Sequence, residues 1–301
     1  MIKIAFREEY ILPLDKKHRF PMDKYELIPQ QLMYEGTLHY SEIKAPELCS
    51  LQDIARTHDV DFIKRAQDQT LSKKEVRNLG FPQSKELFER ELYITQGSID
   101  MALFALENTA IGLNVAGGTH HAFKDKGEGF CLFNDFAVTA NYLLDSELAT
   151  KILIIDLDVH QGNGTASIFK NEPRVFTFSM HGGKNYPFHK ESSDLDLPLK
   201  DGINGIEYHE ILDKYLNKIL DDNNPDIVFY LSGVDVLSTD KLGKLSLSKE
   251  SCALRDRKVI EACFHRNLPM LVAMGGGYSP EIIDIVDAHC NTFRLAKEIY
   301  D

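Results

Sequence analysis

The chain of 301 residues carries 34 Lys and Arg against 46 Asp and Glu, a formal net charge of −12, with 43% hydrophobic residues. This acidic balance disfavours nucleic acid and membrane surfaces as partners, although it is compatible with cationic substrates such as lysine-rich peptides or polyamines. No apolar run reaches the roughly 18 residues of a membrane span, and the first residues lack the apolar core of a signal peptide, so we expect a cytoplasmic protein.

Apolar periodicity predicts strands that alternate with helices along most of the chain. We expect strands over residues 2–6, 113–116, 152–155, 175–180, 227–231 and 270–274. We expect helices over residues 50–66 (in two pieces, broken near residue 59), 91–108, 136–144, 165–170, 206–221, 249–266 and 280–299. The stretches 7–45 and 67–90 are expected to be irregular; within the first, Arg19 either packs on the surface or faces a cavity. The alternation predicts βαβ units and a parallel sheet covered on both faces, in a single domain over residues 1–301.

The stretch KILIIDLDVHQGNG, residues 151–164, begins as a short apolar run that is typical of a buried parallel strand. At its carboxyl end stand Asp156, Asp158 and His160, whose side chains share one face of an extended chain. Burying these groups is unfavourable unless a partner compensates their charge. A bound cation would do so, and an ion-paired structural cluster is the alternative.

Three further strand ends carry unusual residues, and in a parallel α/β sheet the carboxyl ends of the strands meet at one site. Asp235, which could otherwise cap a helix, would complete a set of two carboxylates and one imidazole with Asp158 and His160. Three such ligands are typical of catalytic zinc, and iron or cobalt would also be accepted. The five cysteines contain no CxxC pair, which argues against a disulfide framework and against a thiolate zinc site.

The other two strand ends supply groups for proton transfer and charge stabilisation. His120 and His121 follow a Gly-Gly turn, and a neutral histidine can take a proton from water and give it to a leaving amine. Asp156 and Asn163 are the natural partners to orient these rings. Tyr278 follows three glycines and could hydrogen-bond an oxyanion, or simply pack as an aromatic. Together these residues predict metal-assisted amide hydrolysis.

These residues lie in blocks by which the sequence resembles the histone deacetylase superfamily, which includes bacterial acetylpolyamine amidohydrolases and acetoin-utilisation proteins. The blocks, in the family order, are GGTHHA at 117–122, GEGFCLFND at 127–135, DLDVHQGNG at 156–164, SGVD at 232–235 and GGGY at 275–278. Gln161, Asn163 and the short chain are most similar to the class IV branch and its bacterial relatives. The resemblance implies an arginase-like, three-layer α/β/α fold with a central, mostly parallel sheet of about eight strands.

The resemblance also implies roles for individual residues. Zn²⁺, or alternatively Fe²⁺, would be held by Asp158, His160 and Asp235. The implied catalytic residues are His120, His121 (the principal general base and acid), Tyr278, Asp156 and Asn163. The implied acyl-lysine channel is lined by Gly129, Phe130 and Gly276, and on the opposite wall by Asn185, Tyr186 and Pro187. A structural K⁺ would use Asp156, Asp158, His160, Ser179 and Met180.

The implied activity is removal of acetyl or longer acyl groups from the ε-amine of lysine in a peptide or protein. An acetylpolyamine or other small acylamine is the alternative substrate, and an acyl-lysine binding module without activity is the alternative function. A binuclear manganese ureohydrolase would need carboxylates where this chain has Gly162 and Gly233. Many members of the family have an aspartate in place of Asn163, so we expect a lower pKa for His121 than in those relatives.

Overall fold

The computed structural model describes residues 1–15 and 17–301, and within these residues eight strands form one sheet. The strand order is β2-β1-β3-β8-β7-β4-β5-β6, and all neighbouring strands run parallel. The strands are β1 (Ile2–Ala5), β2 (Ile43–Lys44), β3 (Ile111–Asn114), β4 (Ile152–Asp156), β5 (Val175–Gly182), β6 (Leu195–Leu199), β7 (Ile227–Leu231) and β8 (Met270–Ala273). The prediction of a parallel sheet of about eight strands is confirmed.

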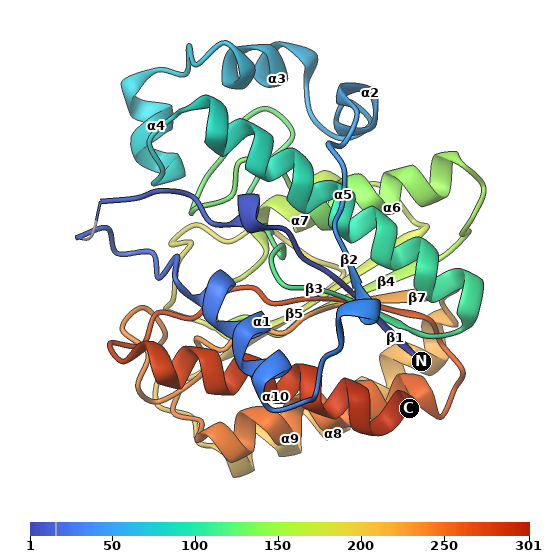
Figure 1. Ribbon diagram of the computed structural model, residues 1–301. Helices are drawn as coiled ribbons and strands as arrows, with labels where there is room; N and C mark the ends of the chain where they lie inside the picture. Colours follow the sequence, from blue (N-terminus) through green and yellow to red (C-terminus); the bar gives the residue numbers. More distant parts are fainter. Residues whose placement is uncertain (16) are drawn as a thin grey trace.

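Helices cover both faces of this sheet and produce three layers (Figure 1). One face carries α1, α8, α9 and α10, the other carries α5, α6 and α7, and the small helices α2, α3 and α4 lie outside this second layer. The helices are α1 (Lys24–Tyr34), α2 (Leu51–Ile54), α3 (Val60–Gln67), α4 (Lys73–Leu79), α5 (Lys85–Asn108), α6 (Asp135–Asp145), α7 (Asn163–Phe169), α8 (Gly205–Asn223), α9 (Lys249–Phe264) and α10 (Ile282–Tyr300). None of the described helices combines the length and apolar character needed to cross a membrane.

Strand β4 shows how the sequence builds the two sides of the core. All five of its residues are buried, as expected for a parallel strand with helices on both faces. Alternate side chains point to opposite faces: Leu153 and Ile155 join one hydrophobic cluster, while Ile152 and Ile154 join the other. The strand is therefore anchored from both sides, which fixes the position of the polar residues that follow it.

Several elements differ from the sequence predictions, among them the short strand β2, which lies at the end of the stretch 7–45. Helix α1 lies within the stretch 7–45 that we expected to be irregular, with Tyr25, Ile28 and Leu32 buried around Pro29; residue 16 of that stretch lies outside the described residues. Helix α4 and the first turn of α5 lie within the stretch 67–90, and each begins at a serine whose hydroxyl accepts a backbone N–H three residues ahead. Strand β6, at the sheet edge, was not predicted because its sequence LDLPL is short and contains a proline and an aspartate.

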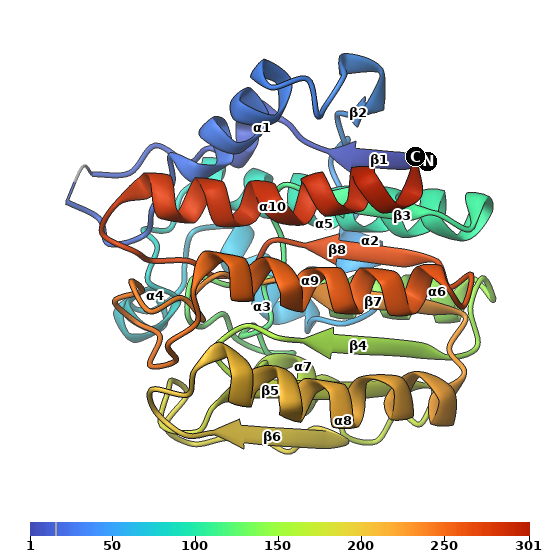
Figure 2. The same ribbon diagram turned by 90° about the horizontal axis from the view of Figure 1, so that it is seen from below.

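The parallel strands all point toward one edge of the molecule, at the left in Figure 2. Strands β3, β4, β7 and β8 are neighbours there, because the order runs β3-β8-β7-β4. Each of the four is followed by one of the segments singled out in the sequence. The fold therefore brings segments from residues 117–122, 156–164, 232–235 and 275–278 to one place.

Candidate active site

Asp158, His160 and Asp235 form a buried group at the ends of β4 and β7. Nδ1 of His160 lies 3.0 Å from Oδ1 of Asp158 and 3.1 Å from Oδ2 of Asp235. One candidate ligand atom from each residue lies within 4.8 Å of the other two, and all three residues are buried. The predicted convergence of these three side chains is present in the structure.

Backbone amides hold the two carboxylates in place. Asp158 accepts hydrogen bonds from the backbone N–H of His160 at 2.9 Å and of Gly276 at 2.8 Å. Asp235 accepts one from the backbone N–H of Val159 at 2.9 Å, which ties the end of β7 to the segment after β4. Such bonds fix the orientation of ligand carboxylates before an ion arrives.

Arg255 of α9 supports the same two segments, and this role was not predicted from the sequence. Its guanidinium is fully buried and donates to the backbone carbonyls of Leu157 at 3.1 Å and Gly233 at 2.6 Å. Asp256 provides its counter-charge at 2.7 Å. A helical Arg-Asp pair has no distinctive sequence pattern, and only the tertiary fold shows that it joins the segments bearing Asp158 and Asp235.

The chemistry of the donor set fits a divalent cation. Burial raises the pKa of Asp235 to about 7. Burial lowers the pKa of His160, but hydrogen bonds to Asp158 and Asp235 outweigh it and raise the pKa to about 10. Protons therefore compensate the cluster when no ion is bound, and a cation with two oxygen ligands and one nitrogen ligand would replace them.

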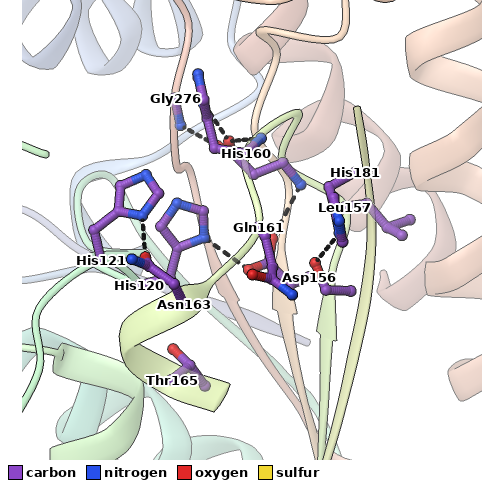
Figure 3. Close-up of polar contacts among 12 residues, drawn as sticks. His120, His121, Asp156, Leu157, His160, Gln161, Asn163, Thr165, His181 and Gly276 are labelled. Carbon is purple, nitrogen blue, oxygen red and sulfur yellow. Dashed lines mark hydrogen bonds and ion pairs between the residues drawn. The ribbon is translucent and has the colours of Figure 1, made fainter. Parts of the chain in front are cut away.

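His120 and His121 lie side by side, each with its own partner (Figure 3). Nδ1 of His120 lies 2.7 Å from Oδ2 of Asp156, and Nδ1 of His121 lies 2.6 Å from Oδ1 of Asn163. The carboxylate and amide oxygens accept from these Nδ1–H groups, so each Nε2 keeps its lone pair. The pairing of these rings with Asp156 and Asn163 agrees with the sequence expectation.

The two imidazoles differ in electrostatics. Burial lowers the pKa of His120, but the Asp156 carboxylate outweighs it and raises the pKa above its ordinary value. Burial, together with the neighbouring rings of His120 and His160, lowers the pKa of His121 well below its ordinary value. His121 is thus the ring that stays neutral and able to accept a proton.

Asp240, which was not predicted from the sequence, fixes the backbone of Tyr278 at the same site. The Tyr278 backbone N–H donates to Oδ2 of Asp240 at 2.5 Å, and Oδ1 of Asp240 accepts from the N–H groups of Leu242 and Gly243. The Tyr278 ring centroid lies 6.3 Å from that of His160. Asp240 therefore fastens the glycine-rich segment to the loop after β7. It lies five residues beyond Asp235, in a stretch without any motif.

A cavity of about 600 Å³ leads from the surface to this group. His121, His160 and Tyr278 line it together with the predicted wall residues Gly129, Phe130, Asn185 and Tyr186. The mouth of the cavity is also lined by charged residues: Arg19, Arg77, Glu128, Lys184 and Lys244. Of these, Arg19 alone had been considered from the sequence as a residue that could face a cavity. The ring of Tyr186 meets that of His121 edge to face at 5.0 Å.

Gly129 and Phe130 form the wall because of backbone geometry. Both have positive φ angles, +57° and +69°, and their backbone N–H groups donate to the carbonyls of Asn78 and Leu79 at the end of α4. A Cβ atom on Gly129 would lie 2.6 Å from the His121 ring, so only glycine permits this close approach.

Two predicted channel residues lie elsewhere. Gly276 lines a much smaller cavity of about 40 Å³ next to the group, because its N–H is turned toward Asp158. Pro187 is not among the described residues that line either cavity. Its neighbours Tyr186 and Phe188 form the wall there. A channel role for these two residues, Gly276 and Pro187, stays a prediction.

The positions that a second metal would need are closed by packing. A Cβ atom on Gly233 would lie 2.2 Å from Oδ2 of Asp158, and one on Gly162 would lie 2.5 Å from Oδ2 of Asp156. Both glycines are therefore required by the contacts of the neighbouring carboxylates. Any larger side chain would have to displace the residues that form the site.

The structure also places the residues implied for K⁺. Asp156 and Ser179 are register partners on β4 and β5, and Met180 follows Ser179 on β5. Oδ1 of Asp156 accepts the backbone N–H of Asp158 at 3.1 Å, and the Ser179 hydroxyl lies 2.9 Å from Nδ1 of His181. The residues are neighbours, and the ion stays a prediction.

Comparison with known proteins gives a consistent assignment. The histone deacetylase domain model matches residues 18–293. An uncharacterized protein of Picosynechococcus sp. is 39% identical over 99% of both chains. Histone deacetylase 2 of Arabidopsis thaliana is 27% identical over 92% of this chain and 74% of its own length, and human histone deacetylase 1 is 31% identical over 88% and 57%. The crystal structure of a histone deacetylase homologue from Aquifex aeolicus covers 99% of this chain and is itself covered to 84%, with a TM-score of 0.85 at 23% identity.

The chain belongs to the histone deacetylase family. This confirms the resemblance found in the sequence and, with the structural match, the arginase-like fold. Membership supports a deacetylase hydrolase as the class of activity, and the family is generally metal-dependent. The assignment to the class IV branch stays a prediction.

Proposed function

We propose that the chain is a zinc-dependent amidohydrolase that removes acetyl or longer acyl groups from the ε-amine of lysine. The observation that carries this proposal is the position of His121 and Tyr278 at the base of one cavity with His160 of the Asp158, His160 and Asp235 group. Family membership supports the same class of reaction.

Asp158, His160 and Asp235 would hold the ion. A bound Zn²⁺ supplies Lewis acidity, which polarises a carbonyl and makes water more acidic. The donors, two carboxylates and one imidazole, are of the types that catalytic zinc sites use.

Different side chains of the chain then carry out the proton transfer and the stabilisation of the developing charge. Nε2 of His121 accepts a proton from the attacking water, because Nδ1 is occupied by Asn163. The Tyr278 hydroxyl donates a hydrogen bond to the carbonyl oxygen as negative charge develops there. His121 finally returns the proton to the leaving lysine amine, and the remaining proton of the attacking water passes from the new carboxylic acid to the amine, so that one amide and one water yield a carboxylate and an ammonium ion.

Turnover of a neutral fluorogenic acetyl-lysine substrate by zinc-loaded protein tests the proposal, with His121→Ala as the matched inactive variant. We expect hydrolysis by the wild type and the loss of several orders of magnitude in kcat for the variant, with zinc retained. Tight binding of acyl-lysine peptides by zinc-loaded wild type without any turnover would instead identify a binding module.

A further inference from the structure

The mouth of the active-site cavity is basic although the chain as a whole is acidic. Among the described residues, five charged residues other than histidine line the cavity: the cations Arg19, Arg77, Lys184 and Lys244 and one carboxylate, Glu128. The chain carries a formal charge of −12, so this local excess of cations runs against the overall balance. The four cations come from the loop before α1, from α4, and from the loops after β5 and β7.

These cations are largely without partners in the protein. Among the described residues, Arg19, Arg77 and Lys244 have no carboxylate within ion-pair distance, and the closest to Lys184 is Asp201 at 4.0 Å. All four side chains belong to exposed residues. Their charge is therefore available to a molecule that approaches the mouth.

Glu128, the carboxylate that lines the mouth in the described part of the chain, already has partners. It pairs with Lys126 at 3.1 Å and accepts a hydrogen bond from the Tyr186 hydroxyl. It therefore contributes little negative potential toward the entrance, and it serves to hold the channel wall at Tyr186. The net field at the entrance is that of the cations.

The position of the charged residues along the cavity indicates which part of a substrate would contact them. The base of the cavity is formed by His121, His160 and Tyr278, whereas the four cations are exposed at its outer end. Arg19 marks the boundary, because its guanidinium lies over the Phe130 ring of the channel wall at 4.8 Å. An acyl group reaches the base, so the cations face the polypeptide on either side of the modified lysine.

From this arrangement we infer that the basic mouth selects acyl-lysines that lie in acidic polypeptide segments, with Asp or Glu near the modified residue. The inference rests on the proposed function and refines its substrate class. It disfavours acylated polyamines, whose remaining amines are cationic and would be repelled by the same residues. An exposed charge pair contributes about 1.5- to 5-fold to affinity, so several together should change kcat/KM roughly ten-fold.

The test uses three peptides that share a central acetyl-lysine and differ only in flanks of Glu, Gln or Lys. For zinc-loaded wild type we expect kcat/KM to fall in the order Glu, Gln, Lys, and the Glu-to-Gln ratio to shrink between about 25 mM and about 300 mM NaCl. A Lys-flanked peptide or N-acetylputrescine hydrolysed better than the Glu-flanked peptide would overturn the inference, and so would equal rates for all flanks.

Charge-reversed variants locate the effect. The triple change Arg77→Glu, Lys184→Glu and Lys244→Glu should reverse the Glu-to-Lys ratio, whereas a control that changes Lys151, Lys170 and Lys214 to Glu alters net charge equally and should keep it. A preserved ratio in the first variant would refute the assignment to the mouth. Stronger inhibition by a single-stranded oligonucleotide than by polyglutamate would assign the surface to nucleic acid instead. If the wild type hydrolyses no peptide at all, the proposed function fails rather than this inference alone.

Discussion

Oδ1 of Asn163 lies 2.6 Å from Nδ1 of His121, so a neutral amide stands where many relatives are expected to present a carboxylate. The amide orients the ring and stabilises a positive charge on it only through its dipole, which is a weaker effect than the charge of a carboxylate. The neighbouring His120 faces the carboxylate of Asp156 at 2.7 Å. Two adjacent imidazoles therefore have different proton affinities, an arrangement by which active sites assign separate tasks to similar groups.

The change Asn163→Asp tests this difference. A carboxylate at this position should raise the pKa of His121, so that the acidic limb of the kcat/KM profile moves to higher pH by about one to two units. The profile is measured from about pH 5 to about pH 9 on a neutral acetyl-lysine substrate. Asn108→Asp, at the far end of α5, is the control. An unchanged limb would show that His121 does not act as the base.

Tyr278→Phe should lower kcat by about 10²- to 10³-fold, because it removes a hydrogen-bond donor to the developing oxyanion and leaves the ring in place. Metal content and thermal stability should stay at the wild-type level. Tyr34→Phe, at a residue that is 90% exposed, is the matched control. Wild-type turnover in the Tyr278 variant would remove this residue from the mechanism.

Asp235→Asn should lower zinc occupancy, because an amide is a weaker ligand than a carboxylate and Asp235 is fully buried beside His160. The zinc content of dialysed protein measures the effect, with Asp222→Asn on the exposed end of α8 as the control. Full occupancy in the Asp235 variant would mean that this carboxylate is not a ligand.

His58 predicts a pH dependence of stability away from the active site. Burial lowers its pKa to about 4, and its ring donates from Nδ1 to the Phe123 carbonyl and accepts the Asn134 N–H at Nε2, both at 2.9 Å. The folded state thus keeps His58 neutral. Between about pH 6.5 and about pH 4 the unfolded chain binds a proton that the folded chain does not, so stability falls as pH falls, by up to about 3 kcal/mol.

Urea unfolding at about pH 7 and about pH 5 measures this loss. The variant His58→Gln should be less stable at neutral pH and show a smaller change between the two pH values. His265→Gln, an exposed substitution at the end of α9, should retain the wild-type dependence. An identical pH dependence in the His58 variant would show that other groups cause the loss.

The central strands and the site could be predicted together from the sequence, because each of these strands is followed by residues with a recognisable chemical role. The apolar run of β4 and the alternation of Asp156, Asp158 and His160 are visible without any tertiary information. Parallel strands then place Asp235 and Tyr278 at the same edge, since neighbouring carboxyl ends meet there. The pairing of His121 with Asn163 follows from the same logic.

Other parts depended on tertiary contacts that local patterns do not reveal. Helix α1 contains Pro29, which reads as a loop residue, and strand β6 contains Pro198 at the edge of the sheet. Arg255 and Asp240 support the site from segments without motifs. The basic mouth combines single residues more than 200 positions apart, such as Arg19 and Lys244, so only the folded chain shows it.

The tight packing at Gly162 and Gly233 restricts how the site could change its chemistry. A two-metal hydrolase cannot be reached by exchanging these glycines for aspartates one at a time, because each new side chain would first displace a carboxylate that the existing site uses. An intermediate with one exchange would have lost the old arrangement before it gained the new one. Laboratory evolution from this scaffold would therefore have to begin with backbone shifts in the segments after β4 and β7.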